Sequence, residues 1–595
     1  MMKKVKLFSG ILASLIIATH AFAVDCIWDG ANADWLTASE WTPDQVPTIS
    51  DGTDTATINA GTVTYVPGGD WKNNSTVTIN NSATWIQATN GGWVRIAGSD
   101  SGKTGFLVLN DNATFNAGTA TRAIVGVDGG TGTVQLNNSA SFTAGNAAEV
   151  IIGRADGTGT VQVNDDAIFD TDGVNMYIAF DDNCSGTLDI NGGTVTVGGE
   201  LWFSYIGDDS FGNDTYGRVN ISGGVLEVVA SANSILFWNI DATSYDHAIN
   251  FDGSGGSIIT HGALNTEFDG TRTSKTWEEL FDAGFLLRNG SNSGSFSDYF
   301  AVKDLGGGER ELILRNVVWG GTDAEWLTAA NWVQDVVPVI SDGTHDATIN
   351  GGTVTYVAGA DWKNNSTVTI NNSGAWIQSG GGAWLRIAGD GSGQTGLLEL
   401  NNNASFNAGT AGVIILGIND GTGTVRLNDD AVLDTNGKPL IIAFDNNSSG
   451  TLDINGGTVT VGGELWITDV NHTADDEPKG SNTYSRINIS DGTLELKVNG
   501  TCIWFWNAGA TDYDHAFNFD GANAGATIIT RGAIKYKANN AVTAEKSWAE
   551  LYADGKLLRN GSNSGTFSNI FAVTNLGDGD RKLSILRKGT IISIQ

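Results

Sequence analysis

The sequence predicts an all-β fold, a parallel β-helix, and three observations support this prediction. Stretches that open Gly-x-φ-x-φ-Asn, where φ is apolar, recur every 27 residues, at Gly105, Gly132, Gly159 and Gly186 and again at Gly396, Gly423 and Gly450. Within these stretches the apolar residues alternate with residues that are mostly polar. The composition is rich in turn residues, with 80 glycines and only 6 prolines. A fixed period of this length is typical of a solenoid, in which each unit buries its apolar side only against its neighbours.

Each 27-residue unit contains three apolar positions, which predict three sheets. Val134 and Leu136 alternate with Gln135, as expected for a strand with one buried face. A second apolar position falls ten residues after the glycine, as at Phe115, and a third falls nineteen residues after it, at Ile124, Ile151, Ile178, Ile415 and Ile442. We expect all three positions to point inward. A propeller blade, the alternative, needs about 40 to 50 residues, so a coil of three strands fits the period better.

An asparagine ends the first predicted strand of each unit: Asn110, Asn137, Asn164, Asn191, Asn401, Asn428 and Asn455. Asparagine tolerates the left-handed backbone conformation that a tight corner needs. Stacked copies can also hydrogen-bond their amides along the axis of the solenoid. We therefore interpret these residues as a structural ladder rather than as a binding site.

The chain consists of two similar halves. Six tryptophans of the first half have counterparts 291 residues later, whereas the stretch TLDINGGTVTVGGELW at 187–202 returns at 451–466, an offset of 264. One 27-residue coil is therefore missing from the second half. Each half begins with a Trp-rich segment and ends with a capping box, at Thr276 and Ser547, followed by a predicted short helix and a hairpin. We predict two β-helix domains with caps, at residues 24–316 and 317–595.

Residues 1–23 have the layout of a secretory signal peptide: three lysines, an apolar run, and small residues at the predicted cleavage site after Ala23. The mature protein is therefore expected to be secreted. No other stretch approaches the ~18 apolar residues of a transmembrane span. The net charge of −34 argues against nucleic acid as a partner, because like charges repel.

Three stretches share the letters GTGTV preceded by an apolar residue and glycine: IIGRADGTGTVQVN, IVGVDGGTGTVQLN and ILGINDGTGTVRLN. Together with the opening WLTAANWVQDVVPVISDGTHDATI, they resemble the secreted bacterial β-solenoids built from autotransporter-associated and PEP-CTERM-associated β-strand repeats. The resemblance implies a right-handed β-helix and export to the extracellular space or cell surface of a Gram-negative-type bacterium. It also implies a surface, matrix or adhesion role, and it transfers no catalytic residues. The final residues KGTIISIQ resemble neither a hydrophobic sorting tail nor a translocating barrel, which favours free secretion.

Tryptophan supplies the first candidate site. The chain contains 19 tryptophans, and indole faces on a rigid sheet can stack on sugar rings. The predicted partner is therefore an extracellular polysaccharide or another cell-surface component. The candidate residues for glycan stacking are Trp71, Trp85, Trp93, Trp202, Trp362, Trp376, Trp384 and Trp466.

A histidine flanked by carboxylates supplies the second candidate site. The stretch YDHAINFDG returns in the second half as YDHAFNFDG. Such a histidine is a candidate general base or part of an ion site. A histidine that is hydrogen-bonded into a corner of the fold is the alternative, which we favour. The residues concerned are Asp246, His247, Asp252, Asp514, His515 and Asp520.

No cofactor is expected, although calcium is a candidate ligand. Carboxylates on neighbouring coils could coordinate it, at Asp165, Asp166, Asp170 and Asp172 and at Asp429, Asp430 and Asp434. Parallel β-helix lyases combine such an ion with a base, so a polysaccharide-degrading lyase or glycosidase is the alternative function. Arg154 and Arg426 are the nearby cations, and they do not correspond between the halves. We therefore expect an exported surface, matrix or adhesion solenoid that binds glycans without a catalytic centre.

Overall fold

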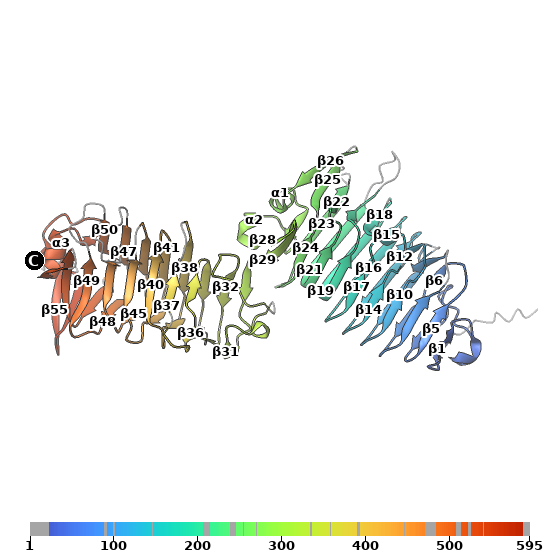
Figure 1. Ribbon diagram of the computed structural model, residues 1–595, viewed down its shortest axis with the longest axis horizontal. Coiled ribbons are helices and arrows are strands. Elements are labelled where there is room, and N and C mark those ends of the chain that lie inside the picture. Colours follow the sequence, from blue (N-terminus) through green and yellow to red (C-terminus); the bar gives the residue numbers. More distant parts are fainter. Residues whose placement is uncertain are drawn as a thin grey trace, which may run out of the picture. The chain divides into compact units, whose positions relative to one another are not determined.

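The computed structural model shows an all-β protein, a parallel β-solenoid of about 16 turns with 55% strand and 5% helix. The predicted fold class is thereby confirmed (Figure 1). The structure describes residues 23–586 except for 89–91, 99–100, 146, 182, 206–214, 239–244, 254, 269, 334–335, 358, 383, 390–392, 445–446, 470–482, 507–512, 522–524 and 539–540. The predicted signal peptide, residues 1–23, lies outside the described part of the chain except for its last residue. Among the described residues, no helix has the length and apolar character needed to span a membrane.

The chain divides into two compact units. The first comprises Met1–Asn220, Gly224–Asn250 and Thr260–Thr276, and the second comprises Ile221–Gly223, Phe251–Ile259 and Trp277–Gln595. The strand ladders divide at another point, because β29 (Glu309–Leu314) belongs to one sheet and β30 (Asn316–Val318) begins the next. The domain boundary at residue 317 stays a prediction.

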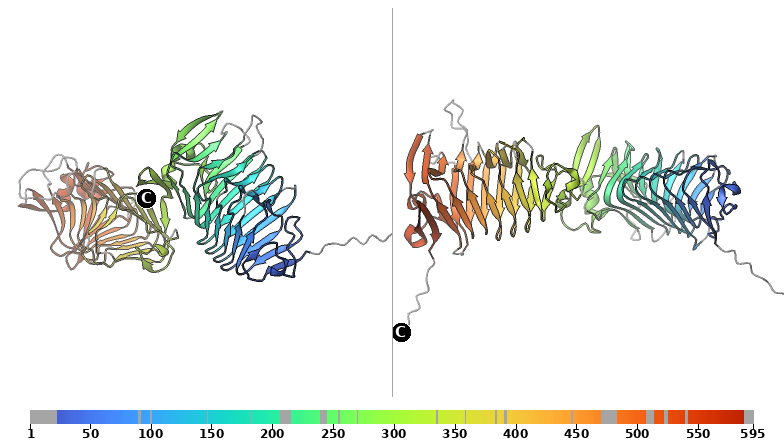
Figure 2. Two further views of the ribbon diagram at one scale, coloured as in Figure 1. Left: turned by 45° about the vertical axis from the view of Figure 1, so that its right-hand side comes forward. Right: turned by 90° about the horizontal axis from the view of Figure 1, so that it is seen from below.

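Successive coils align in register with an offset of 27 residues. Gly105 of β10 (Thr104–Leu109) lies opposite Gly132 of β13 (Thr131–Leu136), which lies opposite Gly159 of β16 (Thr158–Val163). Figure 2 shows the stacked strands of each unit from two further directions. Glycine is needed at these positions because a Cβ on Gly132 would lie 2.3 Å from the carbonyl oxygen of Ile96 on the neighbouring coil. The repeating glycine therefore sets how closely the coils pack.

One sheet in each unit consists mainly of the third strand of each coil, and we call it the third sheet. In the first unit it contains nine strands: β6 (Trp71–Asn73), β9 (Trp93–Ile96), β12 (Arg122–Val127), β15 (Glu149–Arg154), β18 (Asn175–Phe180), β20 (Leu201–Phe203), β22 (Asn233–Trp238), β25 (Ala263–Phe268) and β26 (Thr271–Lys275). In the second unit it contains eight: β34 (Trp362–Asn364), β37 (Trp384–Ile387), β40 (Val413–Ile418), β43 (Leu440–Phe444), β46 (Leu465–Asp469), β49 (Thr501–Trp506), β52 (Ala533–Ala538) and β53 (Ala541–Lys546).

Stacked aromatic rings fill the interior of the first unit. Trp85 lies 4.2 Å from Phe115, with their ring planes 3° apart. Phe115 stacks in turn on Phe142, and Phe142 stacks on Phe169 at 4.7 Å. All four rings come from equivalent positions on successive coils, which explains why the second apolar position recurs with the period of the repeat. The prediction that this position points inward is confirmed.

The asparagine ladder is also confirmed. The Nδ2 of Asn137 donates to Oδ1 of Asn110 at 2.8 Å, and Asn164 donates to Asn137 at 2.9 Å. In the second unit Asn428 donates to Asn401 in the same way. The left-handed residue at these corners is not the ladder asparagine, however. At most of them it is the next residue, for example Asn138 with φ 56°, and after Asn191 and Asn455 it is the second residue on, Gly193 and Gly457. The ladder asparagines are therefore selected for their side-chain amides and not for their backbone conformation.

The third apolar position, nineteen residues after the repeating glycine, does not always point inward as predicted. Ile124 and Ile151 align with Arg95 and Tyr177 on the outward side of the third sheet, whereas Ile178 aligns with inward-pointing neighbours. In the second unit Ile442 belongs to the main core, while Ile415 belongs to a separate small cluster. The prediction of inward isoleucines is therefore wrong for Ile124, Ile151 and Ile415. The reason is that the third sheet carries apolar side chains on its outer face as well as on its inner face.

The caps contain the Trp-rich segments and the helices that the sequence predicts. In the first unit Trp28 and Trp35 both pack edge-on against Trp41, at 5.0 and 4.9 Å. Helices α1 (Trp277–Asp282) and α3 (Trp548–Ala553) lie at the predicted places, and α3 begins with the capping box of Ser547 and Glu550. Each is followed by a short helix and an antiparallel hairpin: α2 (Phe296–Tyr299) with β28 (Phe300–Gly306) and β29, and α4 (Phe567–Ile570) with β55 (Phe571–Gly577) and β56 (Asp580–Ile585).

Candidate functional site on the outer face of the third sheet

A row of mostly apolar side chains runs along the outer face of the third sheet in the first unit. Its members are aligned cross-strand neighbours from successive coils: Arg95, Ile124, Ile151, Tyr177, Trp202 and Leu236. The isoleucines form a small hydrophobic cluster with Phe180, and the partly buried rings of Trp93, Trp202 and Tyr205 pack against it. Ile124 and Ile151 are themselves fully buried, so the partly buried rings form the solvent-facing part of this cluster.

Arginines surround Trp93 at the first coils of this row. The guanidinium carbons of Arg95, Arg122 and Arg154 lie 4.3, 5.2 and 5.3 Å from the centroid of the indole. Each guanidinium also forms an ion pair, Arg95 with Asp70, Arg122 with Glu149 and Arg154 with Asp181. Cation–π contacts and ion pairs therefore fix the ring of Trp93 in place.

Four aromatic residues at the last coils of the first unit form what we call the first aromatic patch: Tyr177, Trp202, Tyr205 and Trp238. The rings of Trp202 and Trp238 are stacked at 5.5 Å with their planes 15° apart. Tyr205 contacts both of them, at 5.4 Å in each case. Burial raises the pKa of Tyr177, so its hydroxyl stays protonated at neutral pH.

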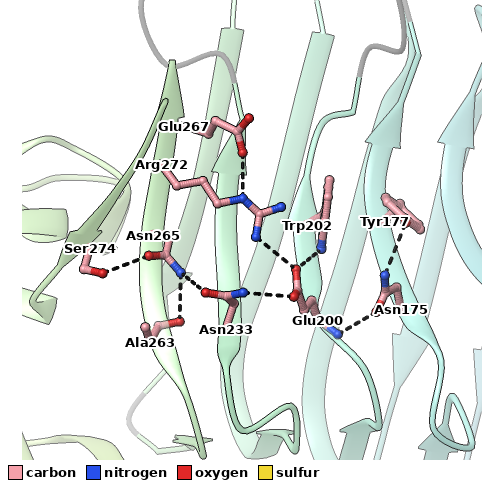
Figure 3. A network of polar contacts seen from close by, with 10 residues as sticks. All are labelled: Asn175, Tyr177, Glu200, Trp202, Asn233, Ala263, Asn265, Glu267, Arg272 and Ser274. Atoms are coloured by element: carbon pink, nitrogen blue, oxygen red, sulfur yellow. Dashed lines mark hydrogen bonds and ion pairs between the residues drawn. The ribbon is translucent and has the colours of Figure 1, made fainter. Parts of the chain in front are cut away.

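A polar network holds this patch in place (Figure 3). The indole N–H of Trp202 donates to Oε2 of Glu200 at 2.7 Å, and Asn233 donates to Oε1 of the same carboxylate. Arg272, on the last strand of the sheet, pairs with Glu267 at 2.8 Å and with Glu200 at 3.8 Å. Its guanidinium also lies 5.1 Å from the ring of Trp202. The aromatic rings are therefore preorganised, while polar groups lie within reach of anything that stacks on them.

The second unit carries a corresponding second aromatic patch, formed by Trp466, Trp504 and Trp506. Trp466 and Trp506 lie 5.7 Å apart, and the indole N–H of Trp466 donates to Glu464 at 2.8 Å. Trp504 is the cross-strand neighbour of Trp466. All three rings are partly exposed. The glutamate two residues before the tryptophan therefore has the same role in both units.

Four of the predicted glycan-stacking residues lie on this outer face, and four do not. Trp93, Trp202, Trp384 and Trp466 are partly exposed on the third sheets, and Trp384 is 36% exposed. Trp71, Trp85, Trp362 and Trp376 are at most 2% exposed and pack in the interior of the solenoid. An indole in the core offers no face to a sugar, so the prediction is wrong for these four residues. They are core residues.

The histidine site is not assembled in the way that general-base catalysis requires. His247 and His515 point into the solenoid and are 6% and 1% exposed, whereas Asp246 and Asp514 are exposed on the opposite face of the same strands. Neighbouring residues of a strand point to opposite faces, so the carboxylate cannot orient the adjacent histidine. Asp246 and Asp514 instead pair with Arg218 and Arg486. The exposed Asp252 and Asp520 follow the ends of these strands.

Burial keeps both histidines neutral. It lowers the pKa of His247 to about 3, with a further contribution from the positive charge of Arg218. The pKa of His515 is lowered to about 3 by burial and by Lys556 and Arg486. His515 is hydrogen-bonded to Thr468 Oγ1, which in turn contacts Ser485. His515 is thus hydrogen-bonded inside the solenoid, as the favoured alternative expects, although it lies within β50 (Tyr513–Phe519) and not at a corner. Neither histidine is exposed for the predicted acid–base or ion site, which stays a prediction.

Two of the acidic residues that suggested calcium have structural roles at corners. Asp165 and Asp429 are left-handed residues, and their carboxylates accept from the backbone N–H groups of Asn138 and Asn402 on the preceding coils. Within the described residues, no group of three or more His, Cys, Asp or Glu side chains is placed to hold a metal ion. A calcium site stays a prediction.

Several residues of the two patches were missed in the sequence. Tyr177, Tyr205, Trp238, Trp504 and Trp506 were not candidates, because they lie neither where a coil starts nor in the repeated Glu-Leu-Trp stretches. A usable signal was present in the Phe-Trp pairs that end β22 and β49. Phe237 and Phe505 point inward, so the adjacent Trp238 and Trp506 must point outward.

Comparisons with known proteins gave no match. No protein-family model matches the sequence. No curated protein and no solved structure is similar to the chain at a significant level.

Proposed function

We propose that this chain is an exported β-solenoid of the extracellular space or cell surface that binds polysaccharide on the outer faces of its third sheets. The observation that carries the proposal is the pair of aromatic patches, in which partly exposed indoles are held by hydrogen bonds and ring contacts. The proposed relationship to the autotransporter-associated and PEP-CTERM-associated repeat proteins agrees with this role.

Three physical features support polysaccharide as the ligand. Flat aromatic faces match the apolar faces of sugar rings, and carboxylate, amide and guanidinium groups beside them can bond hydroxyl groups. Adjacent coils repeat these positions about every 4.8 Å along the axis, which suits a chain of similar residues better than a compact ligand. The rings are also ordered before binding, so little conformational entropy is lost when a ligand stacks on them.

The cleavage alternative receives less support from the first aromatic patch. A lyase or glycosidase needs a carboxylate or base that is free to act on its substrate. Glu200 is bonded to Trp202, Asn233 and Arg272, and Glu267 is paired with Arg272. These carboxylates position side chains, which is the role expected in a binding surface.

The proposal predicts a loss of binding when the rings are removed. Retention of the mature protein in native gels that contain plant, algal or bacterial polysaccharides measures binding. We expect retention to weaken by more than about tenfold in a variant that lacks the tryptophans of both patches, because stacked aromatics dominate such interfaces. This variant combines Trp202→Ala/Trp238→Ala with Trp466→Ala/Trp504→Ala/Trp506→Ala.

The matched control removes exposed apolar side chains elsewhere. Leu305 and Leu576 are 40% and 52% exposed on the terminal hairpins, and their replacement by alanine is expected to leave retention unchanged. Equal retention of the aromatic variant and the control would contradict the proposal. Release of new reducing or unsaturated sugar ends during the assay would favour the enzyme instead.

A further inference from the structure

The two aromatic patches share their tryptophans but differ in the charged residues beside them. Trp202 and Trp238 correspond to Trp466 and Trp506, and the strands that follow are β25 and β52. On β25 the outward neighbours of Leu236 and Trp238 are Asn265 and Glu267. On β52 the outward neighbours of Trp504 and Trp506 are Lys535 and Lys537. The second unit therefore presents two ammonium groups where the first presents an amide and a carboxylate.

The charges of the first patch are satisfied within the protein. Glu267 is 4% exposed and pairs with Arg272, which also reaches Glu200 (Figure 3). Arg272 lies over the ring of Trp202, and Asn265 donates to Asn233 at 3.0 Å. No net positive charge is left here to attract an anion, so this patch suits an uncharged chain.

The lysines of the second patch are arranged differently. Lys537 Nζ lies 3.5 Å from the centroid of Trp506, and Lys535 Nζ lies 5.8 Å from that of Trp504. Among the described residues, neither ammonium lies within 4.0 Å of a carboxylate oxygen. Acidic residues in the same sheet are Glu464, which holds the indole of Trp466, and the exposed Glu545, the cross-strand partner of Lys535. The ammonium groups therefore remain available to a ligand at the level of the rings.

We propose that the second aromatic patch binds an anionic polysaccharide, whose carboxylate or sulfate groups bond Lys535 and Lys537 while its sugar rings stack on Trp466 and Trp504. This inference rests on the proposed function and adds to it a ligand class and a difference between the two units. Charge-assisted hydrogen bonds give the affinity. The whole chain has a net charge of −34, so its other surfaces are largely acidic and repel polyanions. Specificity thus follows from attraction at one patch and repulsion elsewhere.

The test uses the full mature chain with Trp202→Ala/Trp238→Ala, so that only the second patch can bind. Lys535→Asn/Lys537→Glu places the residues of the first patch on the second. The probes are polygalacturonate for carboxylate, a sulfated galactan for sulfate, and an unsulfated galactan as the uncharged chain. We expect the swap to weaken binding of one or both anionic probes by about tenfold or more. The anionic probe that binds the parent more tightly shows whether the patch prefers carboxylate or sulfate.

The control is Lys497→Asn, which removes a lysine elsewhere in the second unit that pairs with Glu495 and is expected to bind as the parent does. Unchanged binding of the anionic probes after the swap, or binding of the uncharged galactan alone, would overturn the inference. In the latter case, loss of that binding in Trp466→Ala/Trp504→Ala/Trp506→Ala would leave the proposed function standing. Absence of binding to all three probes would overturn the inference, and the broader panel of polysaccharides then decides the proposed function.

Discussion

Replacement of Trp376 by alanine is expected to lower the free energy of unfolding of the second unit by about 3 to 5 kcal/mol. Its indole is fully buried and stacks on Phe406 at 4.3 Å, with the planes 2° apart, and it also contacts Trp362 at 5.1 Å. Alanine would remove these contacts and leave a cavity in a stack that the rigid coils cannot close. Urea denaturation followed by far-ultraviolet circular dichroism measures the loss.

Trp384 provides the matched comparison for this result. It lies on the outer face of the third sheet and is 36% exposed, so Trp384→Ala is expected to cost about 1 kcal/mol or less. The contrast separates the two classes of tryptophan that the sequence does not distinguish. If Trp376→Ala cost no more than Trp384→Ala, the assignment of Trp376 to the core would be refuted.

Mild acid is expected to destabilise both units. His247 and His515 have pKa values of about 3 in the folded protein and about 6.5 when unfolded. Between these values the unfolded chain binds more protons, so the stability is complete above pH 6.5 and is lost as the pH falls toward 3. Each histidine is expected to contribute a loss of about 2 kcal/mol between pH 7 and pH 5.

Glutamine variants isolate this effect from the titration of carboxylates, most of which occurs at lower pH. The free energy of unfolding of His247→Gln/His515→Gln, measured in urea at pH 7, 6 and 5, should depend on pH much less than that of the parent. The comparison concerns the slope, so an overall loss of stability in the variant does not affect it. Equal slopes in variant and parent would show that the two histidines are not held neutral.

The fold could be predicted because its determinants are local and repeated. The glycine that permits close packing, the alternating strand and the ladder asparagine each recur at intervals of 27 residues, and a stack of coils converts that interval directly into register. The period of 27 residues did not identify Trp85 as part of the aromatic stack, because its coil is three residues longer than the others in the stack. Trp85 aligns with Phe115 at a separation of 30.

The candidate site could be predicted only in part. Sugar-binding tryptophans were expected, but burial decides which of them are accessible, and burial depends on the side of the sheet to which each residue points. Ile124 and Ile151 were predicted to point inward because apolar residues normally lie on the inward face. They belong instead to a buried cluster on the outer face. The network of Glu200, Asn233 and Arg272 joins residues up to 72 positions apart, which no local pattern reveals.

The most direct test of the account is hydroxyl-radical footprinting of the mature protein with and without a polysaccharide that it retains. We predict that the bound chain protects the partly exposed rings of the third sheets from oxidation, at Trp202, Trp238, Trp466, Trp504 and Trp506. Exposed apolar residues on the other sheets, Phe106 and Ile168, should be oxidised equally in both samples. Protection of Phe106 and Ile168 with unchanged oxidation of the five tryptophans would contradict the assignment of binding to the third sheets.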